Sequence, residues 1–249
     1  MSADVVAGKR AVLEAVRAGE VSEVLIARDA RKSPALRDVV GAARDAHVRT
    51  REVDRDDLDR LAADHRGVVA RVDAMRVSVT LSERDLSAFP WTSDAVVVIL
   101  DGVQDPQNLG AAARSVEACG GAMIITRTHR AAPVTSSAIR ASAGALLHLP
   151  HARVANLSRA IERLQDLGFT VVGLDEAAPR SIYEHPCPRG RIALVLGGEG
   201  AGISRLVREH CDLLVSLPMR GKVGSLNASA SLAAVLYGYV LPDRREVQP

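Results

Sequence analysis

The sequence predicts an α/β protein with two domains, and three observations support this prediction. Residues 1–80 alternate between short helical and strand-like stretches. Residues 81–93 show little periodicity and include Ser, Asp, Pro and Trp, a composition expected of a linker. From residue 94, runs of Val, Ile and Leu alternate with helical stretches, which is typical of a parallel sheet covered on both faces. We therefore expect a small α/β domain at 1–80 and a parallel-sheet domain at 94–249.

In the first domain, hydrophobic periodicity predicts short elements in alternation. Gly19 ends the first helical pattern, and Pro34 stands near the first turn of the second. The predicted helices lie at 10–18, 34–46 and 56–63, and the predicted strands at 23–27, 48–53 and 68–72.

In the second domain, the predicted strands are continuous apolar runs bounded by Gly, Asp or Pro. They lie at 95–100, 122–126, 170–174, 192–196 and 213–217, and the predicted helices at 110–118, 136–143, 157–167, 204–210 and 228–241. Functional groups of such sheets gather at the carboxyl ends of the strands. We therefore expect the residues that carry the chemistry at those ends.

The composition is that of an ordinary globular protein, with 249 residues, 47% of them apolar and 25% charged. The longest wholly apolar run, 95–100, is far shorter than the roughly 20 residues of a membrane span. The N-terminus lacks the apolar core of a signal peptide, so we expect a cytoplasmic protein without membrane contact. Cys119, Cys187 and Cys211 form no Cys-x-x-Cys pair, which disfavours a disulfide framework and a zinc site.

The positive charge is unevenly distributed, although the net charge is only +2. Between Glu117 and Glu162 the chain has five arginines and no acidic residue. Aromatic residues make up 2% of the chain, which argues against RNA binding by base stacking and favours contact with phosphates. Arg127, Arg130 and Arg140 are the predicted RNA contacts, and solvated helix faces are the alternative explanation.

A glycine-rich loop, Gly-Gly-Glu-Gly-Ala-Gly at 197–202, follows a predicted strand. A P-loop requires Lys and then Ser or Thr after its last Gly, but Ile203 and Ser204 follow here. A dinucleotide fingerprint would need Gly at 203 and an acidic residue near 218, which is Pro. The loop therefore disfavours polyphosphates and a Rossmann oxidoreductase, and it permits a small adenosine-containing ligand without phosphates.

Three motifs stand at the ends of the predicted strands. They are Asp-Gly-Val-Gln-Asp-Pro-Gln-Asn-Leu-Gly at 101–110, Leu-Gly-Gly-Glu-Gly-Ala-Gly at 196–202, and Leu-Pro-Met-Arg-Gly-Lys-Val-Gly-Ser-Leu-Asn-Ala-Ser at 217–229. In this order and spacing they resemble the motifs of the SpoU (TrmH-like) family of ribose 2′-O-methyltransferases. Residues 8–15 and 65–70 resemble the ends of the ribosomal-protein-like RNA-binding domain of many such enzymes, with Arg66 in place of the more usual Gln.

The resemblance implies a trefoil-knotted parallel-sheet domain of the SPOUT type that binds S-adenosylmethionine in the knot. The sequence shows no cluster of metal-ligating residues, so we expect no metal. The resemblance also implies a homodimer that acts on RNA. The layout is most similar to that of enzymes that methylate a guanosine ribose in large-subunit (23S) rRNA. The alternatives are a tRNA methyltransferase, an antibiotic-resistance rRNA methyltransferase, and an RNA-binding module that has lost activity.

By motif position, the resemblance also assigns roles to individual residues. The catalytic candidates are Asn108, Arg114, Glu199, Ser225 and Asn227, and the cofactor-binding candidates are Leu174, Gly197, Gly198, Leu217, Met219, Ser225 and Leu226. A guanidinium is effectively always protonated, so Arg114 is expected to stabilise the developing alkoxide instead of acting as a base. The alternatives are a helix cap for Asn108, core packing for Leu217 and Leu226, and a surface position for Arg114.

Overall fold

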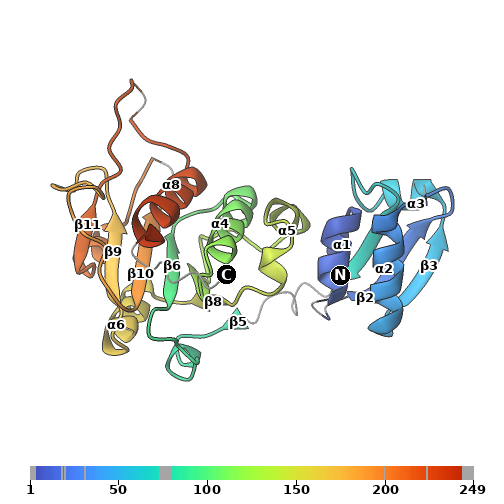
Figure 1. Ribbon diagram of the computed structural model, residues 1–249, viewed down its shortest axis with the longest axis horizontal. Coiled ribbons are helices and arrows are strands. Elements are labelled where there is room, and N and C mark those ends of the chain that lie inside the picture. Colours follow the sequence, from blue (N-terminus) through green and yellow to red (C-terminus); the bar gives the residue numbers. More distant parts are fainter. Residues whose placement is uncertain are drawn as a thin grey trace.

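The computed structural model contains two sheets that follow one another along the chain (Figure 1). It describes residues 4–17, 19, 21–30, 32–72, 80–198, 200–222 and 224–242. We call residues 4–72 the N-terminal region and residues 80–242 the C-terminal region. Within the described part of the chain, no helix has the length and hydropathy needed to cross a membrane.

The N-terminal region is a mixed four-stranded sheet with the order β1-β4-β2-β3. Its strands are β1 (Asp4–Ala7), β2 (Val21–Ala27), β3 (Arg49–Val53) and β4 (Val68–Val72). Strand β4 is antiparallel to β1 and β2, whereas β3 is parallel to β2. Helices α1 (Lys9–Arg17) and α2 (Pro34–Asp45) cover one face with apolar side chains, and the short α3 (Arg55–Asp59) covers part of the other.

The C-terminal region is a seven-stranded sheet with the order β11-β9-β10-β6-β7-β8-β5, in which every pair is parallel. Its strands are β5 (Thr80–Leu81), β6 (Val96–Asp101), β7 (Met123–Arg127), β8 (His151–Val154), β9 (Thr170–Leu174), β10 (Ile192–Gly197) and β11 (Leu213–Val215). This arrangement confirms the predicted α/β fold with a parallel sheet.

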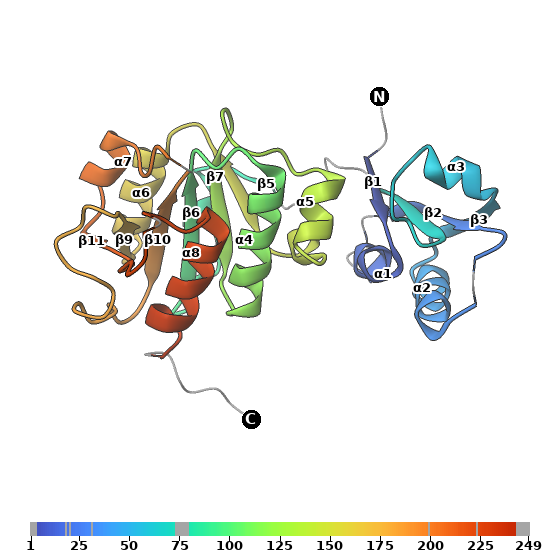
Figure 2. The ribbon, with the colours of Figure 1, turned by 90° about the horizontal axis from the view of Figure 1, so that it is seen from above.

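Helices cover both faces of this sheet (Figure 2). On one face lie α4 (Pro106–Ala118), α5 (Ser136–Ala141) and α8 (Ala228–Val235), which continues as a π-helical turn at Leu236–Val240. On the other face lie α6 (Leu157–Asp166) and α7 (Arg205–Glu209). Because the sheet is covered on both faces, its central strands are buried along their length, as the continuous apolar runs predict.

The sequence patterns missed three strands, β1, β5 and β8. Strand β5 has two residues and β1 has four, which is too short for a periodicity to emerge. Strand β8 has four residues and includes His151 and Arg153, so it does not form an apolar run. Each is held by pairing with a neighbouring strand, a contact that local periodicity does not report.

Helix α4 begins four residues earlier than predicted, and this changes the interpretation of Asn108. The side chain of Asp105 accepts a hydrogen bond from the main-chain N–H of Gln107 (3.0 Å), and Pro106 occupies the first helical position. Asp105 is therefore the N-cap, and the alternative explanation of Asn108 as a helix cap is wrong.

The segment 81–93, predicted to be a linker, packs against the C-terminal sheet. Leu86 is fully buried, and the indole N–H of Trp91 donates to its carbonyl oxygen (2.7 Å). The Arg191 guanidinium donates to the carbonyl oxygens of Trp91 and Thr92 (3.1 and 2.9 Å). The aromatic and apolar side chains of segment 81–93 account for this packing. The division into domains at 1–80 and 94–249 stays a prediction.

The two regions share an apolar cluster at α5. Ile139 of α5 and Leu147 are buried in the same cluster as Val12 and Val16 of α1. Gly144 has a positive φ of 95°, and a Cβ there would lie 2.9 Å from the Cβ of Glu14. The glycine therefore permits the close approach of α1 to the C-terminal region.

Candidate active site

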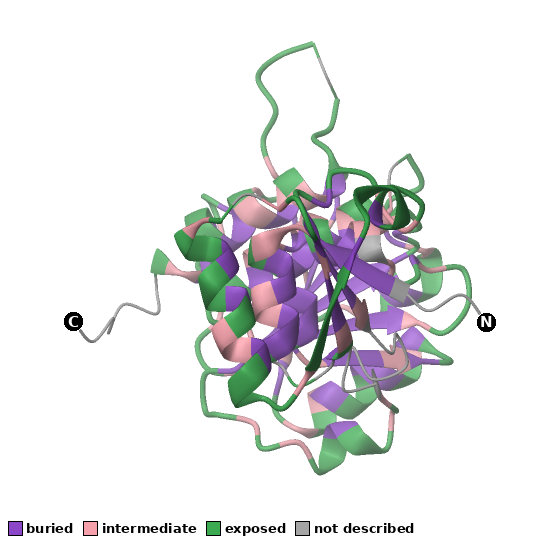
Figure 3. Ribbon diagram, turned by 90° about the vertical axis from the view of Figure 1, so that its right-hand side faces the viewer, coloured by how far each residue is buried: buried purple, intermediate pink, exposed green. Residues whose placement is uncertain are grey.

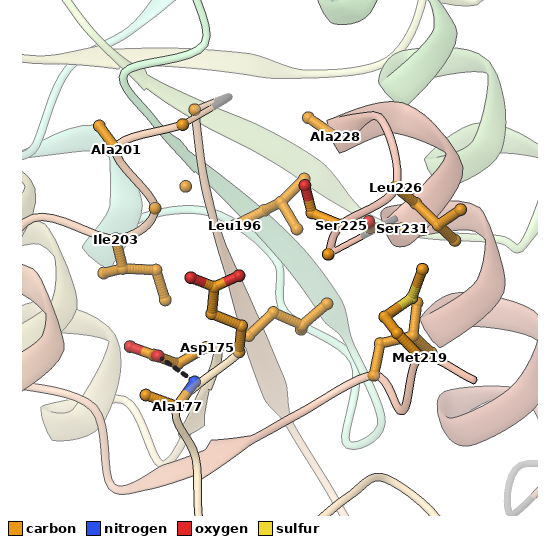
Figure 4. A pocket seen from close by; sticks show the side chains of 18 of the residues that line it. Asp175, Ala177, Leu196, Ala201, Ile203, Met219, Ser225, Leu226, Ala228 and Ser231 are labelled. Atoms are coloured by element: carbon orange, nitrogen blue, oxygen red, sulfur yellow. Dashed lines mark hydrogen bonds between the residues drawn. The ribbon is translucent and has the colours of Figure 1, made fainter. Parts of the chain in front are cut away.

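A pocket of about 510 Å³ lies at the carboxyl ends of β9, β10 and β11 (Figure 4). Ala201 and Ile203 lie on one side, and Met219 and Leu226 on the other. This volume is within the range typical of small-molecule sites. All seven cofactor-binding candidates line the pocket: Leu174, Gly197, Gly198, Leu217, Met219, Ser225 and Leu226.

The third motif forms a loop that extends from the sheet (Figures 1 and 3). Within it, residues 218–222 and 224–227 are all exposed. Asn227 ends the loop and caps α8, because its side-chain oxygen accepts hydrogen bonds from the N–H and hydroxyl of Ser229 (2.9 and 2.6 Å). The cap fixes where the exposed loop ends and α8 begins.

The glycine-rich loop leaves no room for a side chain at its first two glycines, Gly197 and Gly198. A Cβ at Gly197 would lie 1.9 Å from the carbonyl carbon of Gly202, and one at Gly198 would lie 2.5 Å from the carbonyl oxygen of Gly102. Both distances are far shorter than van der Waals contact, so only glycine fits at these positions. The catalytic candidate Glu199 belongs to this loop and lies outside the described residues.

Asp101 holds both ends of this loop. Its carbonyl oxygen accepts from the N–H of Gly198 (2.8 Å), and its carboxylate accepts from the N–H of Ser204 (2.8 Å). The same carboxylate, 5% exposed as a residue, accepts from Nε and Nη2 of Arg127 (3.1 and 2.9 Å). The Arg127 charge offsets the cost of burying that carboxylate. Arg127, predicted to contact RNA, thus has a partner inside the protein.

A second buried carboxylate, Asp175, lies directly in the pocket wall after β9. One oxygen accepts from the N–H of Ala177 (2.9 Å), and the other forms an ion pair with Nη2 of Arg208 in α7 (2.5 Å). Glu176 also lines the pocket and is exposed. The predicted strand at 170–174 puts Asp175 and Glu176 directly after a strand end, but nothing in the sequence patterns pointed to Arg208.

The pocket therefore combines leucine and methionine side chains with carboxylates and glycine main chain. Apolar side chains can contact a ring system, and carboxylates can accept hydrogen bonds from hydroxyl or ammonium groups. The only arginine in the described lining, Arg208, is already paired with Asp175. This lining suits a ligand with hydroxyls and positive charge better than a polyphosphate.

The structure joins the first and third motifs through two asparagines. The side-chain N–H of Asn227 donates to the side-chain oxygen of Asn108 (2.9 Å), across 119 positions of sequence. Ser225 lines the pocket two residues before Asn227. Three of the five catalytic candidates are thus gathered beside the pocket or in its lining.

Arg114 is in a different position. It is exposed on α4, six residues after Asn108 and hence about 9 Å further along the helix axis, and it does not line the pocket. Arg130, in the loop after β7, and Arg140, in the last turn of α5, are also exposed. A single chain therefore does not bring Arg114 into its own pocket lining.

No cysteine or histidine is among the described residues that line the pocket. Burial raises the pKa of the Cys211 thiol to about 12, which leaves it protonated and unreactive near neutral pH. Among the described residues, no group of three His, Cys, Asp or Glu side chains is placed to hold a metal ion.

Comparisons with known proteins match both regions. Residues 95–237 match the SpoU rRNA Methylase family, and residues 5–77 match the RNA 2'-O ribose methyltransferase substrate binding family. A 23S rRNA (guanosine-2'-O-)-methyltransferase, RlmB of Xanthomonas campestris, is 39% identical over 238 residues, which cover 93% of this chain and 94% of that protein. The putative TrmH family tRNA/rRNA methyltransferase YacO of Bacillus subtilis is 36% identical over 236 residues and 94% of both chains.

Solved structures give the same result. The SpoU methyltransferase AviRb from Streptomyces viridochromogenes, in complex with the cofactor AdoMet, has a TM-score of 0.79 and 28% sequence identity. The match covers 96% of this chain and 90% of that one. The similarity therefore extends over both sheets and their order along the chain.

Proposed function

The chain belongs to the SpoU rRNA methylase family and transfers the methyl group of S-adenosylmethionine to a ribose 2′-hydroxyl of RNA, and we propose that its target is a guanosine of large-subunit rRNA. The observation that carries this proposal is the 39% identity to RlmB over 94% of that protein. Such a target implies a cytoplasmic location. The trefoil knot, supported by family membership, is part of the same proposal.

The pocket fits S-adenosylmethionine. When bound, this cofactor supplies an electrophilic methyl group to the attacking 2′-oxygen. We propose that Leu174, Leu217 and Leu226 contact the adenine, together with the main chain at Gly197 and Gly198, where a Cβ would not fit. Met219 and Ser225 complete the candidate set. The acidic wall at Asp175 offers acceptors for hydroxyl or ammonium groups.

The role proposed for Arg114 follows from its charge. Methyl transfer to a hydroxyl builds negative charge on the 2′-oxygen as its proton leaves, and a guanidinium stabilises that charge while remaining protonated. Asn227, held by Asn108, positions the loop that carries Ser225. Glu199 is proposed to orient Arg114 or the substrate.

We further propose that the enzyme is a homodimer. Large apolar side chains are exposed on the pocket loop and on the helix that follows it, Leu226 at 43% and Tyr237 at 51%. Because Arg114 does not line its own chain's pocket, a second copy is a source of the missing arginine. Light scattering tests the dimer. Mixing Arg114→Ala chains with pocket-blocked Gly198→Val chains tests the shared site, because activity returns only if one copy supplies Arg114 to the other.

Two experiments test the proposed substrate and cofactor. Mapping of 2′-O-methyl groups in rRNA and tRNA from cells lacking the gene should show the loss of one guanosine modification in large-subunit rRNA. Loss from tRNA alone would contradict the proposal. Calorimetry with S-adenosylmethionine in EDTA should give one site per chain, whereas binding of only NAD or ATP would contradict the cofactor assignment.

A further inference from the structure

Three arginines from neighbouring strands lie around one glutamate on the N-terminal sheet. Glu23 of β2 is directly opposite Arg49 of β3 and Arg71 of β4. Arg51 lies two residues after Arg49 and therefore faces the same side of the sheet. We call Arg49, Arg51 and Arg71 the arginine cluster. The cluster exists only because β2 lies between β3 and β4.

The arginine cluster is on the face that the two long helices leave uncovered. On this face Leu25, Val53 and Val69 are buried with Leu58 of α3. Arg51 lies two residues before Val53 on β3, and Arg71 lies two residues after Val69 on β4. The Arg49, Arg51 and Arg71 side chains are 77%, 47% and 40% exposed, whereas that of Glu23 is 15% exposed. Along β3 and β4 the face thus changes from apolar to basic, whereas β2 contributes Glu23.

The ion pairs with Glu23 leave donors of the two most exposed arginines, Arg49 and Arg51, available to solvent. The Nε atoms of Arg49, Arg51 and Arg71 lie 3.9, 3.5 and 3.8 Å from the Glu23 carboxylate oxygens. These distances give charge attraction but not well-formed hydrogen bonds. Nε of Arg71 is itself buried, so Arg71 reaches solvent only through the exposed remainder of its side chain. One carboxylate therefore orients three guanidinium groups and leaves a net charge of +2.

We propose that the arginine cluster binds backbone phosphates of the RNA substrate. This inference rests on the proposed function only in requiring that the substrate is RNA. Guanidinium groups bind phosphate in a bidentate manner, and here three of them share one partly exposed sheet face. Contacts to phosphate position the RNA and carry no sequence information. The arginine cluster therefore contributes affinity for RNA, and other residues select the target base.

The test compares two double variants with the same change in charge. Arg49→Gln/Arg51→Gln removes two members of the arginine cluster, which are exposed enough for the fold to persist. Arg37→Gln/Arg44→Gln, on exposed positions of α2, is the matched control on the opposite face. Filter binding to an rRNA fragment and to a tRNA transcript is measured over a range of salt concentrations. Thermal melts and calorimetry with S-adenosylmethionine establish that both variants are folded.

We expect the cluster variant to bind both RNAs about tenfold or more weakly, with a salt slope reduced by roughly 1.4 to 1.8 for two lost phosphate contacts. Its methylation rate at saturating RNA should equal that of the wild type. Affinities equal to those of the α2 control, or a loss for only one of the two RNAs, would overturn the proposal. Binding is read without turnover, so a wrong assignment of the rRNA target would leave this result interpretable.

Discussion

The two sheets of this protein expose their polar groups in different places. In the C-terminal sheet all six residues of β6 are buried, and the polar groups of the pocket lie where strands end. In the N-terminal sheet, four of the five residues of β3 are exposed. A parallel sheet covered on both faces thus forms a pocket at one edge, whereas a half-covered mixed sheet presents a charged face. The first suits a small ligand, and the second suits a polyanion.

The two regions also differ in how they treat buried polar side chains. In the described N-terminal region only His65 is buried, and both its ring nitrogens have partners, Asp59 at 2.9 Å and the N–H of Gly67 at 3.0 Å. In the C-terminal region the buried Asp101 and Asp175 are paired with arginines beside or in the pocket. Buried charge is therefore concentrated where the ligand site lies, as expected of functional sites.

The largest expected effect concerns the chemistry of the C-terminal region. Arg114→Ala should lower turnover by about 10²–10³ and leave the affinity for S-adenosylmethionine nearly unchanged, because one preorganised charge donor is lost. Arg114→Lys keeps the charge but not the planar fork, so partial activity would favour simple electrostatics. Single-turnover methylation of an rRNA fragment gives the rates, with Arg159→Ala on α6 as the control. A wild-type rate at saturating RNA would make Glu199 the next candidate.

The next effect concerns the support of the pocket. Asp101→Asn removes the charge that holds Arg127 and weakens the hydrogen bond to Ser204. We expect the affinity for S-adenosylmethionine to fall about tenfold, and the free energy of unfolding to fall by about 2 kcal/mol, less than for a fully buried pair because Arg127 is half-buried. Calorimetry and urea denaturation measure these quantities.

The double variant Asp101→Asn/Arg127→Gln is the matched control for that experiment. It removes both charges together, so much of the lost stability should return. Unchanged cofactor affinity in Asp101→Asn would show that the loop does not depend on this carboxylate.

A smaller effect is a pH dependence specific to the C-terminal region. Burial, with a contribution from the positive charge of Arg153, lowers the pKa of His151 from 6.5 to about 4. The unfolded chain therefore takes up a proton before the folded one does. The stability from neutral His151 is fully present above pH 6.5 and is lost as the pH falls from 6.5 towards 4. Between pH 7 and pH 5 this amounts to about 2 kcal/mol.

Urea denaturation at several pH values measures this dependence. His151→Gln should flatten the profile between pH 7 and pH 5, whereas the exposed His129→Gln should keep the wild-type slope. Equal slopes for all three proteins would show that His151 does not control acid sensitivity.

The smallest effect concerns the division of labour between the two regions. A chain that begins at Thr80 keeps β5, which belongs to the C-terminal sheet. It should bind S-adenosylmethionine within about twofold of the full-length affinity and bind RNA more weakly. Because Ile139 and Leu147 become exposed, a cooperative thermal transition must first show that the chain is folded. Loss of S-adenosylmethionine binding from a folded shortened chain would contradict the proposal that the C-terminal region alone binds the cofactor.

The sequence by itself was sufficient to predict the parallel sheet, the family and the residues that line the pocket. The runs of Val, Ile and Leu at β6, β7, β9, β10 and β11 predicted a buried parallel sheet, because such strands are apolar on both faces. The order of the three motifs pointed to the family, and the seven predicted cofactor-binding residues all line one pocket. These inferences needed only local composition and spacing. Short strands such as β8 left no such pattern.

Only the tertiary structure shows which charged and polar side chains pair with one another. The pairs Asp101–Arg127 and Asp175–Arg208, the hydrogen bond between Asn108 and Asn227, and the arginine cluster around Glu23 all join residues far apart in the sequence. The order of strands in each sheet and their register determine which side chains become neighbours. A local pattern can predict that a strand is buried, but it carries no information on the strand beside it, and the energy of a charge depends on that neighbour.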